Sequence, residues 1–137
     1  MQRNMRLGRV FNCEPVSSTK ELSPLEKWYN ELLEKTESQL TISDVMKMIR
    51  QNVFLEIAVG RAMVYLKKDT FIGEMYEGEL LDKISKLDKR ILGRYINDLK
   101  EIIITCRQEC ITHEWGYEGE KEEIDKVLNL IDKKING

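Results

Sequence analysis

The sequence predicts an all-α fold, a single-domain bundle of about six helices with a loosely ordered N-terminal arm. Apolar residues recur at spacings of three and four along most of the chain. Sequences typical of helix N-termini precede several of these stretches, and no convincing alternating strand pattern is present. Only two prolines and eight glycines occur, fewer than a many-turned β-sandwich needs.

The N-terminal residues 1–22 are expected to form the arm, and residues 23–137 the helical domain. The arm shows no sustained period, although a short extended piece is expected at 9–13. Its arginines could make a contact surface, but chain termini are usually loose, so we favour a mobile tail.

Two capping boxes predict where the first two helices begin. Ser23-Pro24-Leu25-Glu26 combines an N-cap serine, proline at the first helical position and a glutamate three residues after the cap. Thr41-Ile42-Ser43-Asp44 repeats this pattern and opens a helix that should run to Gln51.

Four further helices are expected downstream. The helix at 54–68 is apolar almost all round, so it should be the central one. The next two are expected at 77–87 and 88–112, and Gly93 should cost the longer one some stability. The last helix is expected at 119–135.

Composition sets broad limits on function. Hydrophobic residues make up 42% of the 137 residues and charged residues 34%, as in a globular protein with a heavily charged surface. A formal charge of −2 gives no reason to expect general nucleic-acid binding. No apolar run approaches the roughly 20 residues that span a bilayer, and three cysteines, an odd number, fit a reducing compartment. We therefore expect a cytoplasmic protein.

Cys106, Cys110 and His113 share one face of the expected 88–112 helix, which raises the possibility of zinc. The same face continues upstream in apolar residues, and buried cysteine packs as a small hydrophobe. Structural zinc normally has four protein ligands, and no second Cys or His pair supplies the remainder. We therefore interpret these residues as core and expect no metal site.

Catalytic motifs are also missing from the sequence. The chain has no P-loop, no GxGxxG and no HExxH, and its Cys–His pair lacks a third orienting group. The 24 acidic residues give no reason to choose two as a general acid and base. We expect no enzyme activity, no catalytic residue and no cofactor.

Two groups of acidic residues crowd the starts of the fourth and sixth expected helices. The first acidic cluster comprises Glu74, Glu77, Glu79 and Asp82. The second acidic cluster comprises Glu114, Glu118, Glu120, Glu122, Glu123 and Asp125. Acids at a helix N-terminus are favoured by the macrodipole, but that effect fades after the first turn. The remaining acids would suit a surface for a basic partner or would simply form a solvated face.

Residues 40–87 carry a family resemblance. It rests on Leu40-Thr41 with Ser43-Asp44-Val45, on Met48-Ile49-Arg50-Gln51, on the helix ending Ala62-Met63-Val64-Tyr65-Leu66, and on Tyr76-Glu77-Gly78-Glu79-Leu80-Leu81. The stretch resembles all-helical immunity proteins of bacterial contact-dependent growth inhibition (CDI) systems. Members commonly carry proline at the places held here by Glu56, Gly60 and Thr70.

The resemblance implies a cytoplasmic protein that binds and neutralises the cognate C-terminal toxin domain of a CDI effector. Such toxins are often nucleases, whose phosphate-binding surface is basic, and an acidic inhibitor would complement it. The implied mechanism is steric occlusion by a monomer that binds one-to-one, without contact to nucleic acid or membrane. Aromatic anchors are expected at Tyr76, Trp115 and Tyr117, with the two acidic clusters around them. Core packing is the competing interpretation for Tyr76 and Trp115.

Two other function classes remain open at this stage. The chain could be a small helical adaptor or regulatory domain that binds an endogenous protein partner. It could also be an enzyme with an unrecognised carboxylate or thiol site.

Overall fold

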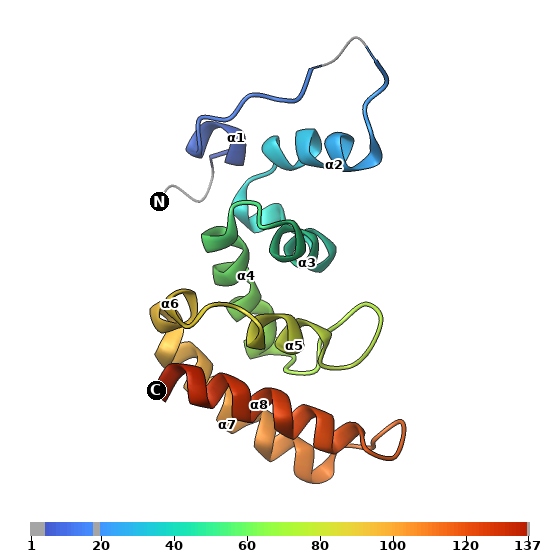
Figure 1. Cartoon of the computed structure of the whole chain (residues 1–137), viewed down its shortest axis with the longest axis vertical. Coiled ribbons are helices and arrows are strands. Elements are labelled where there is room, and N and C mark those ends of the chain that lie inside the picture. Colours follow the sequence, from blue (N-terminus) through green and yellow to red (C-terminus); the bar gives the residue numbers. More distant parts are fainter. Residues whose placement is uncertain (1–4, 18–19, 137) are drawn as a thin grey trace.

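The computed structural model describes residues 5–17 and 20–136, and these residues confirm the all-α prediction (Figure 1). Within these ranges, the one β-type pairing is an isolated bridge between Arg6 and Thr36. Residues 1–4 and 18–19 of the expected arm, and residue 137, lie outside the described residues.

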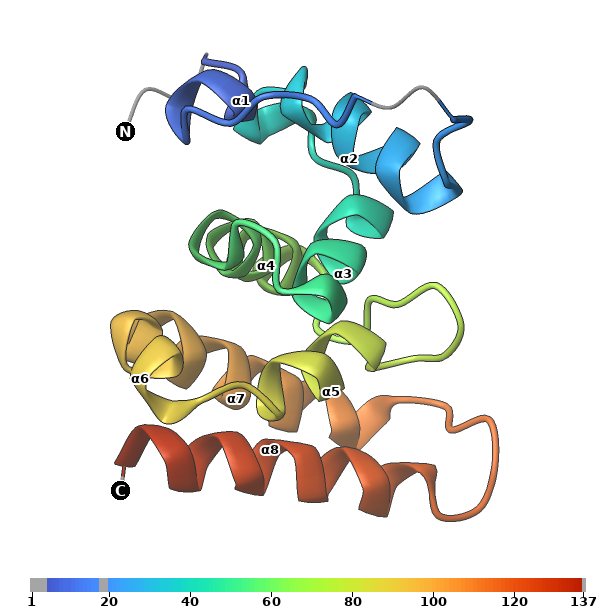
Figure 2. The same cartoon turned by 45° about the horizontal axis from the view of Figure 1, so that its top comes forward.

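The helices form stacked layers (Figure 2). In chain order they are α1 (Leu7–Val10), α2 (Pro24–Leu33), the 3-10 turn η1 (Glu37–Gln39), α3 (Ile42–Gln51), α4 (Leu55–Lys68), α5 (Glu79–Ser85), α6 (Lys89–Leu92), the 3-10 turn η2 (Gly93–Tyr95), α7 (Ile96–Thr112) and α8 (Glu120–Asn136). Helices α1 and α2 lie at one end of the stack, α3 and α4 in the middle, and α5 to α8 at the other end.

Both predicted capping boxes are present. The Ser23 hydroxyl accepts from the Glu26 amide, and the Glu26 side chain accepts from the Ser23 amide. Thr41 and Asp44 exchange the same pair of hydrogen bonds at the start of α3. Each box satisfies two backbone donors that a helix start would otherwise leave unpaired, so these boundaries follow from local sequence.

Helix α4 occupies the centre of the molecule, as its nearly continuous apolar sequence predicts. It packs against α3, α5 and α7. Its buried residues are Ile57, Ala58, Val59, Ala62, Met63 and Leu66. Ion pairs from Lys67 to Asp98 and from Arg94 to Glu56 tie its two ends to the η2–α7 segment.

The single helix expected at 88–112 is divided in the structure. Helix α6 ends at Leu92, η2 follows at Gly93, and α7 begins at Ile96. Gly93 favours a break because it lacks a side chain that would stabilise a helix interior. The Tyr95 hydroxyl then donates to the Glu56 carbonyl on α4, 3.2 Å away, so a tertiary contact holds the turn in place.

The N-terminal arm carries one turn of helix where a short extended piece was expected, so that expectation is wrong. Residues 7–10 form α1, and Leu7 is only 1% exposed within the core. The Leu7 amide donates to the Lys35 carbonyl, and Phe11 stacks on Phe54 with ring centroids 4.3 Å apart. These contacts attach the arm to the helices that follow it.

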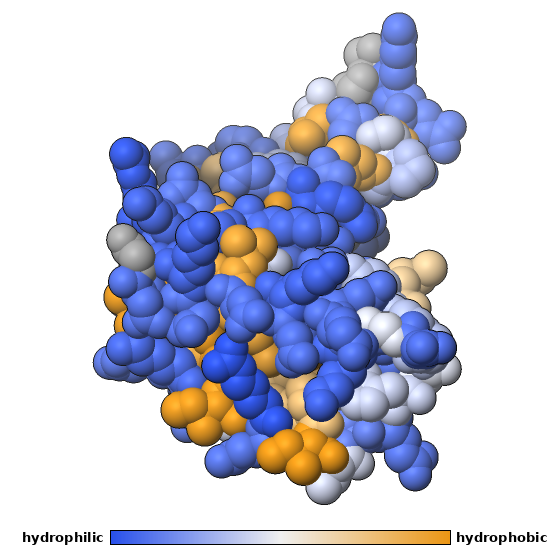
Figure 3. All heavy atoms as spheres, turned by 60° about the horizontal axis from the view of Figure 1, so that its bottom comes forward, coloured by the Kyte–Doolittle hydropathy of each residue, from blue (hydrophilic) through white to orange (hydrophobic). Residues whose placement is uncertain are grey.

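The surface over α7 and α8 is mostly hydrophilic, with separate apolar side chains among polar ones (Figure 3). Ile104, Ile111 and Leu130 are exposed on these two helices. Scattered exposed apolar residues are normal for a globular protein. Within the described residues, no helix is both long and apolar enough to cross a bilayer.

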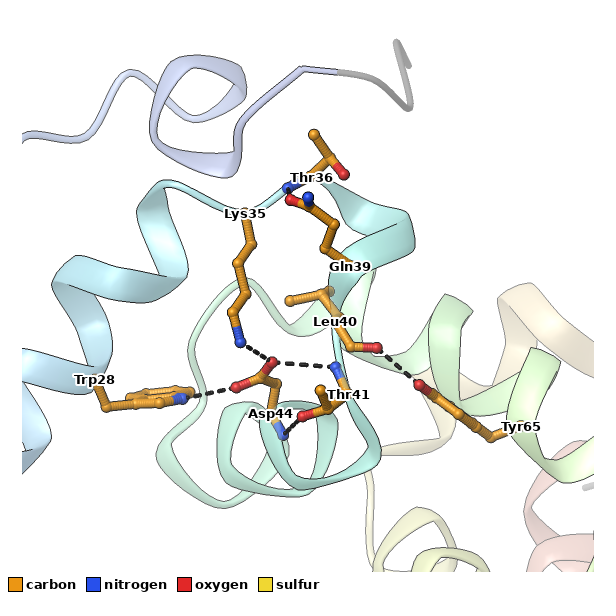
Figure 4. Close-up of polar contacts among 8 residues, drawn as sticks. All are labelled: Trp28, Lys35, Thr36, Gln39, Leu40, Thr41, Asp44 and Tyr65. Carbon is orange, nitrogen blue, oxygen red and sulfur yellow. Dashed lines mark hydrogen bonds and ion pairs between the residues drawn. The ribbon is translucent and has the colours of Figure 1, made fainter.

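A buried carboxylate joins α2, α3 and the segment between them (Figure 4). Asp44 accepts from the Trp28 indole at 3.1 Å and pairs with the Lys35 ammonium at 2.5 Å, in addition to its capping bonds with Thr41. The neighbouring Leu40 carbonyl accepts from the Tyr65 hydroxyl of α4 at 2.8 Å. The second capping box is therefore also the point where three parts of the chain meet.

Candidate partner-binding site

The two acidic clusters, separate in sequence, lie together in the structure. The segments before α5 and before α8 reach the same end of the molecule (Figures 1 and 2), and the two helices pack against each other. His113 Nε2 lies 2.6 Å from Glu77 Oε2, which connects the two segments directly. The two acidic clusters therefore lie at one end of the molecule, which we call the acidic end.

The acidic end contains the same tetrapeptide twice. Tyr76-Glu77-Gly78-Glu79 opens α5, and Tyr117-Glu118-Gly119-Glu120 opens α8. Gly78 has φ of 82° and Gly119 has φ of 94°, a left-handed conformation that favours glycine. In both copies, the amide of the second glutamate donates to the tyrosine carbonyl at 3.3 Å. The repeat is thus a shared way of turning the chain into a helix.

The last glutamate of each copy points inward. Glu79 is 7% exposed, and its Oε1 accepts from the Glu74 and Met75 amides. Glu120 is 8% exposed, and its Oε1 accepts from the Gly116 amide. These two predicted site residues therefore hold the preceding loops in shape.

The tyrosine of each copy donates a hydrogen bond to an acid six residues later. Tyr76 donates its hydroxyl to Asp82 at 2.7 Å, and Tyr117 donates to Glu123 at 2.5 Å. Burial and the Asp82 carboxylate raise the pKa of Tyr76 to about 12, and the hydrogen bond to Glu123 raises the pKa of Tyr117 to about 12. Both phenols therefore stay protonated at neutral pH.

Both tyrosines remain about half exposed, at 51% for Tyr76 and 54% for Tyr117. Tyr76 is therefore not a buried core residue. Trp115 differs, because it packs partly buried and edge-on against Phe71 and His113, with ring centroids 5.8 and 4.6 Å away. Of the three expected anchors, the two tyrosines are the ones presented to solvent.

A cavity of about 250 Å³ opens between the two copies of the tetrapeptide. We call it the tyrosine pocket. Tyr76 and Tyr117 line it, and Ile124 and Val127 of α8 supply its apolar surface. The carboxylates of Glu77, Asp82, Glu120 and Glu123 line it too, with Lys126 as the basic residue.

The Cys106–Cys110–His113 face is divided in the structure. Cys106 and Cys110 are buried thiols in the core, and burial raises the pKa of Cys106 to about 12 and also raises that of Cys110. A thiol with a raised pKa is a poor nucleophile at neutral pH. His113 follows the last residue of α7, stacks on Phe71 and contacts Glu77 instead.

Among the described residues, Glu77, His113 and Glu120 bring potential metal-ligand atoms within 4.8 Å of one another. They offer three ligand atoms, one fewer than a closed structural zinc site. His113 and Glu77 already bond each other, and Glu120 accepts from Gly116. Existing hydrogen bonds thus account for much of this arrangement.

Comparison with known families identifies the chain. A sequence model of one family, described as CDI immunity proteins, matches residues 11–102. The chain belongs to this family. A search of curated proteins returns no match.

Membership indicates a toxin-neutralising immunity function for this CDI immunity protein. The matched region contains the first acidic cluster and ends within α7. The second acidic cluster, Trp115 and Tyr117 lie beyond it. The acidic end of this immunity protein therefore combines a part within the family match and a part outside it.

The repeated tetrapeptide is the feature at the acidic end that interpretation of the sequence missed. Its two copies are identical in sequence, and each places glycine two residues after a tyrosine at a helix start. Comparing the chain with itself over four-residue windows would have found it. The acids that accept from the two tyrosines, Asp82 and Glu123, would then stand out, since each follows its tyrosine by six residues.

Proposed function

We propose that this CDI immunity protein binds a basic nuclease domain, the cognate C-terminal toxin of a CDI effector, through its acidic end, and blocks it sterically in a one-to-one complex. The observation that carries the proposal is the juxtaposition of the two acidic clusters across the His113–Glu77 contact. The protein would act in the cytoplasm without catalysis.

At this end, four exposed acids make no side-chain contact that would explain them by a role in the fold. In residues 5–17 and 20–136, the side-chain carboxylates of Glu74, Glu114, Glu118 and Glu122 make no hydrogen bond or ion pair. Like charges held close together repel each other and lower stability. Such a concentration is favourable when an oppositely charged partner neutralises it, and it would speed the partner's approach.

A nuclease fits this surface because an enzyme that grips phosphates presents positive charge. An acidic inhibitor that covers such a surface would exclude the nucleic acid by volume and by potential. The immunity protein would therefore need no group that acts on the toxin chemically.

The test is co-purification with the toxin domain encoded beside the immunity gene, followed by a nuclease assay. We expect a one-to-one complex in which nuclease activity falls in proportion to the immunity protein added. If the two proteins do not associate, the proposed function is wrong.

Charge reversal then tests the acidic end. The Glu118→Lys/Glu122→Lys variant should slow association at low salt and flatten its salt dependence. The matched control is Glu14→Lys/Glu31→Lys, which changes the net charge equally at exposed sites in the arm and on α2. Equal association rates for the two variants would show that the toxin docks elsewhere.

A further inference from the structure

The tyrosine pocket is a built cavity with two aromatic walls. The hydroxyls of Tyr76 and Tyr117 donate to Asp82 and Glu123, which restrains the two rings, while about half of each residue stays exposed. Its volume of about 250 Å³ exceeds the roughly 30 Å³ that one water occupies in the liquid. It lies below the range of about 300–1,000 Å³ typical of small-molecule sites. The size suits one long side chain.

The charge of the pocket points to a cation. Four carboxylates line it with one basic residue, Lys126, and the ammonium of Lys86, outside the lining, lies 3.6 Å from Asp82 Oδ2. Asp82 and Glu123 each accept from a tyrosine hydroxyl, and an ionised carboxylate has about four acceptor positions. Both can therefore accept further hydrogen bonds.

Glu120 gives the most specific indication of a ligand. Its side chain is more than nine-tenths buried and lines the pocket. Oε1 accepts from the Gly116 amide, whereas no hydrogen bond in the described part of the chain engages Oε2. Oε2 therefore keeps its acceptor positions available, and a cationic donor would form a charge-assisted hydrogen bond to it, which is stronger than a neutral one.

A guanidinium group matches these features better than an ammonium group. Its planar face stacks on aromatic rings, and its five N–H donors bind carboxylates in pairs. The apolar surface of Ile124 and Val127 would cover the methylene stem of the same side chain. Lysine offers a compact charge that is strongly hydrated and stacks less well.

We propose that the tyrosine pocket receives an arginine side chain of the toxin, held between Tyr76 and Tyr117 and bound by Glu120. This inference rests on the proposed function, because the arginine belongs to the neutralised toxin. Two contributions to binding are then distinct: the exposed acids raise the association rate of the toxin, and the pocket lowers its dissociation rate.

The two copies of the tetrapeptide supply a matched pair of variants. Glu120→Gln keeps an oxygen for the Gly116 amide and removes the charge from the pocket. Glu79→Gln makes the same change at the equivalent position of the other copy, which is equally buried but does not line the pocket. We expect Glu120→Gln to raise the dissociation rate of the toxin complex at least about tenfold, and Glu79→Gln to change it less than about threefold. Thermal melting of both variants checks that they fold.

A second measurement needs no toxin. Nα-acetyl-arginine methylamide at millimolar concentration should shift the backbone amide resonances of Gly78, Ile124 and Val127, and Nα-acetyl-lysine methylamide should shift them much less. Glu120→Gln should abolish the arginine response, whereas Glu79→Gln should preserve it. Absence of a localised shift, or an equal response to lysine, would overturn the proposal.

The outcomes separate the two proposals. Suppose that the wild-type protein binds the neighbouring toxin but the complexes of Glu120→Gln and Glu79→Gln dissociate at the same rate. The proposed arginine site is then wrong, and the proposed immunity function is supported. If free arginine binds the pocket but no toxin associates, the pocket binds arginine and the proposed toxin partner is wrong.

Discussion

His113 Nε2 and Glu77 Oε2 lie 2.6 Å apart, although 36 positions separate the residues in sequence. This contact links the segment before α8 to the segment before α5. His113 also stacks on Phe71, with ring centroids 4.3 Å apart, so its ring is held from two directions. His113 therefore helps to fix the relative position of the two tetrapeptides, together with the packing of α5 against α8.

Replacing His113 with phenylalanine should loosen the acidic end while the fold is retained. Phenylalanine keeps the stacking on Phe71 and loses the bond to Glu77. We expect a loss of about 1 kcal/mol in unfolding free energy and faster amide hydrogen exchange at 73–78 and 113–119. His113→Ala removes the stacking as well and should cost more. Unchanged exchange in both segments would show that the contact does not hold them together.

The two glycines of the repeated tetrapeptide should respond differently to alanine. Both have positive φ, so each substitution strains the backbone by about 1 kcal/mol. A Cβ at Gly78 would also lie 2.5 Å from Ile124 Cδ1, whereas nothing lies within 4 Å of one at Gly119. We expect Gly78→Ala to destabilise the protein by about 1–3 kcal/mol more than Gly119→Ala in chemical denaturation. Equal losses would mean that α5 and α8 can move apart at little cost.

The parts of the fold that sequence predicted are those fixed by neighbouring residues. The capping boxes at Ser23 and Thr41 are complete within four residues, so their helix starts were found. The break at Gly93 was missed, because the turn is held by Tyr95 contacting Glu56, which lies 39 positions away. A periodic pattern contains no information on such a contact.

In the candidate site too, features fixed by neighbouring residues were predicted, and features that depend on distant contacts were not. Both acidic clusters were predicted as separate groups, since each belongs to one helix start. Their union was not predicted, because it depends on how α5 packs beside α8. The sequence also did not predict that Glu79 and Glu120 point inward. An acid at a helix start is usually explained by the helix dipole, and the loop amides that these two glutamates bind come together only in the folded structure.

Leu7 tests how far the N-terminal arm contributes to stability. Its side chain is 1% exposed, and its amide donates to Lys35. Leu7→Ala should lower the unfolding free energy by about 2–5 kcal/mol, as expected for truncating a buried leucine. Val10→Ala is the control, since Val10 lies in the same turn and is only partly buried. Similar small losses for both would mean that the arm detaches before the remaining helices unfold.

Asp44 should make stability depend on acid pH. Burial acts to raise its pKa, but the Lys35 ammonium, the Thr41 amide and the Trp28 indole outweigh burial and hold the pKa below its ordinary value. The folded state therefore binds this proton less readily than the unfolded state. The resulting stabilisation is complete above the unfolded pKa of about 3.9 and is lost as pH falls below it toward the folded pKa.

Asp44→Asn should consequently cost about 1–3 kcal/mol at pH 7, since it removes the charge that Lys35 and two N–H donors engage. The difference between wild type and variant should shrink as pH falls from about 4 toward the lowered folded pKa, because the unfolded carboxylate takes up its proton before the folded one does. Lys35→Met is the matched change on the other partner, and it should leave a smaller loss because the Trp28 and Thr41 bonds remain. Denaturant titrations at several pH values measure all three proteins. A difference between wild type and Asp44→Asn that stays constant over this range would show that the charge of Asp44 does not stabilise the junction of α2 and α3.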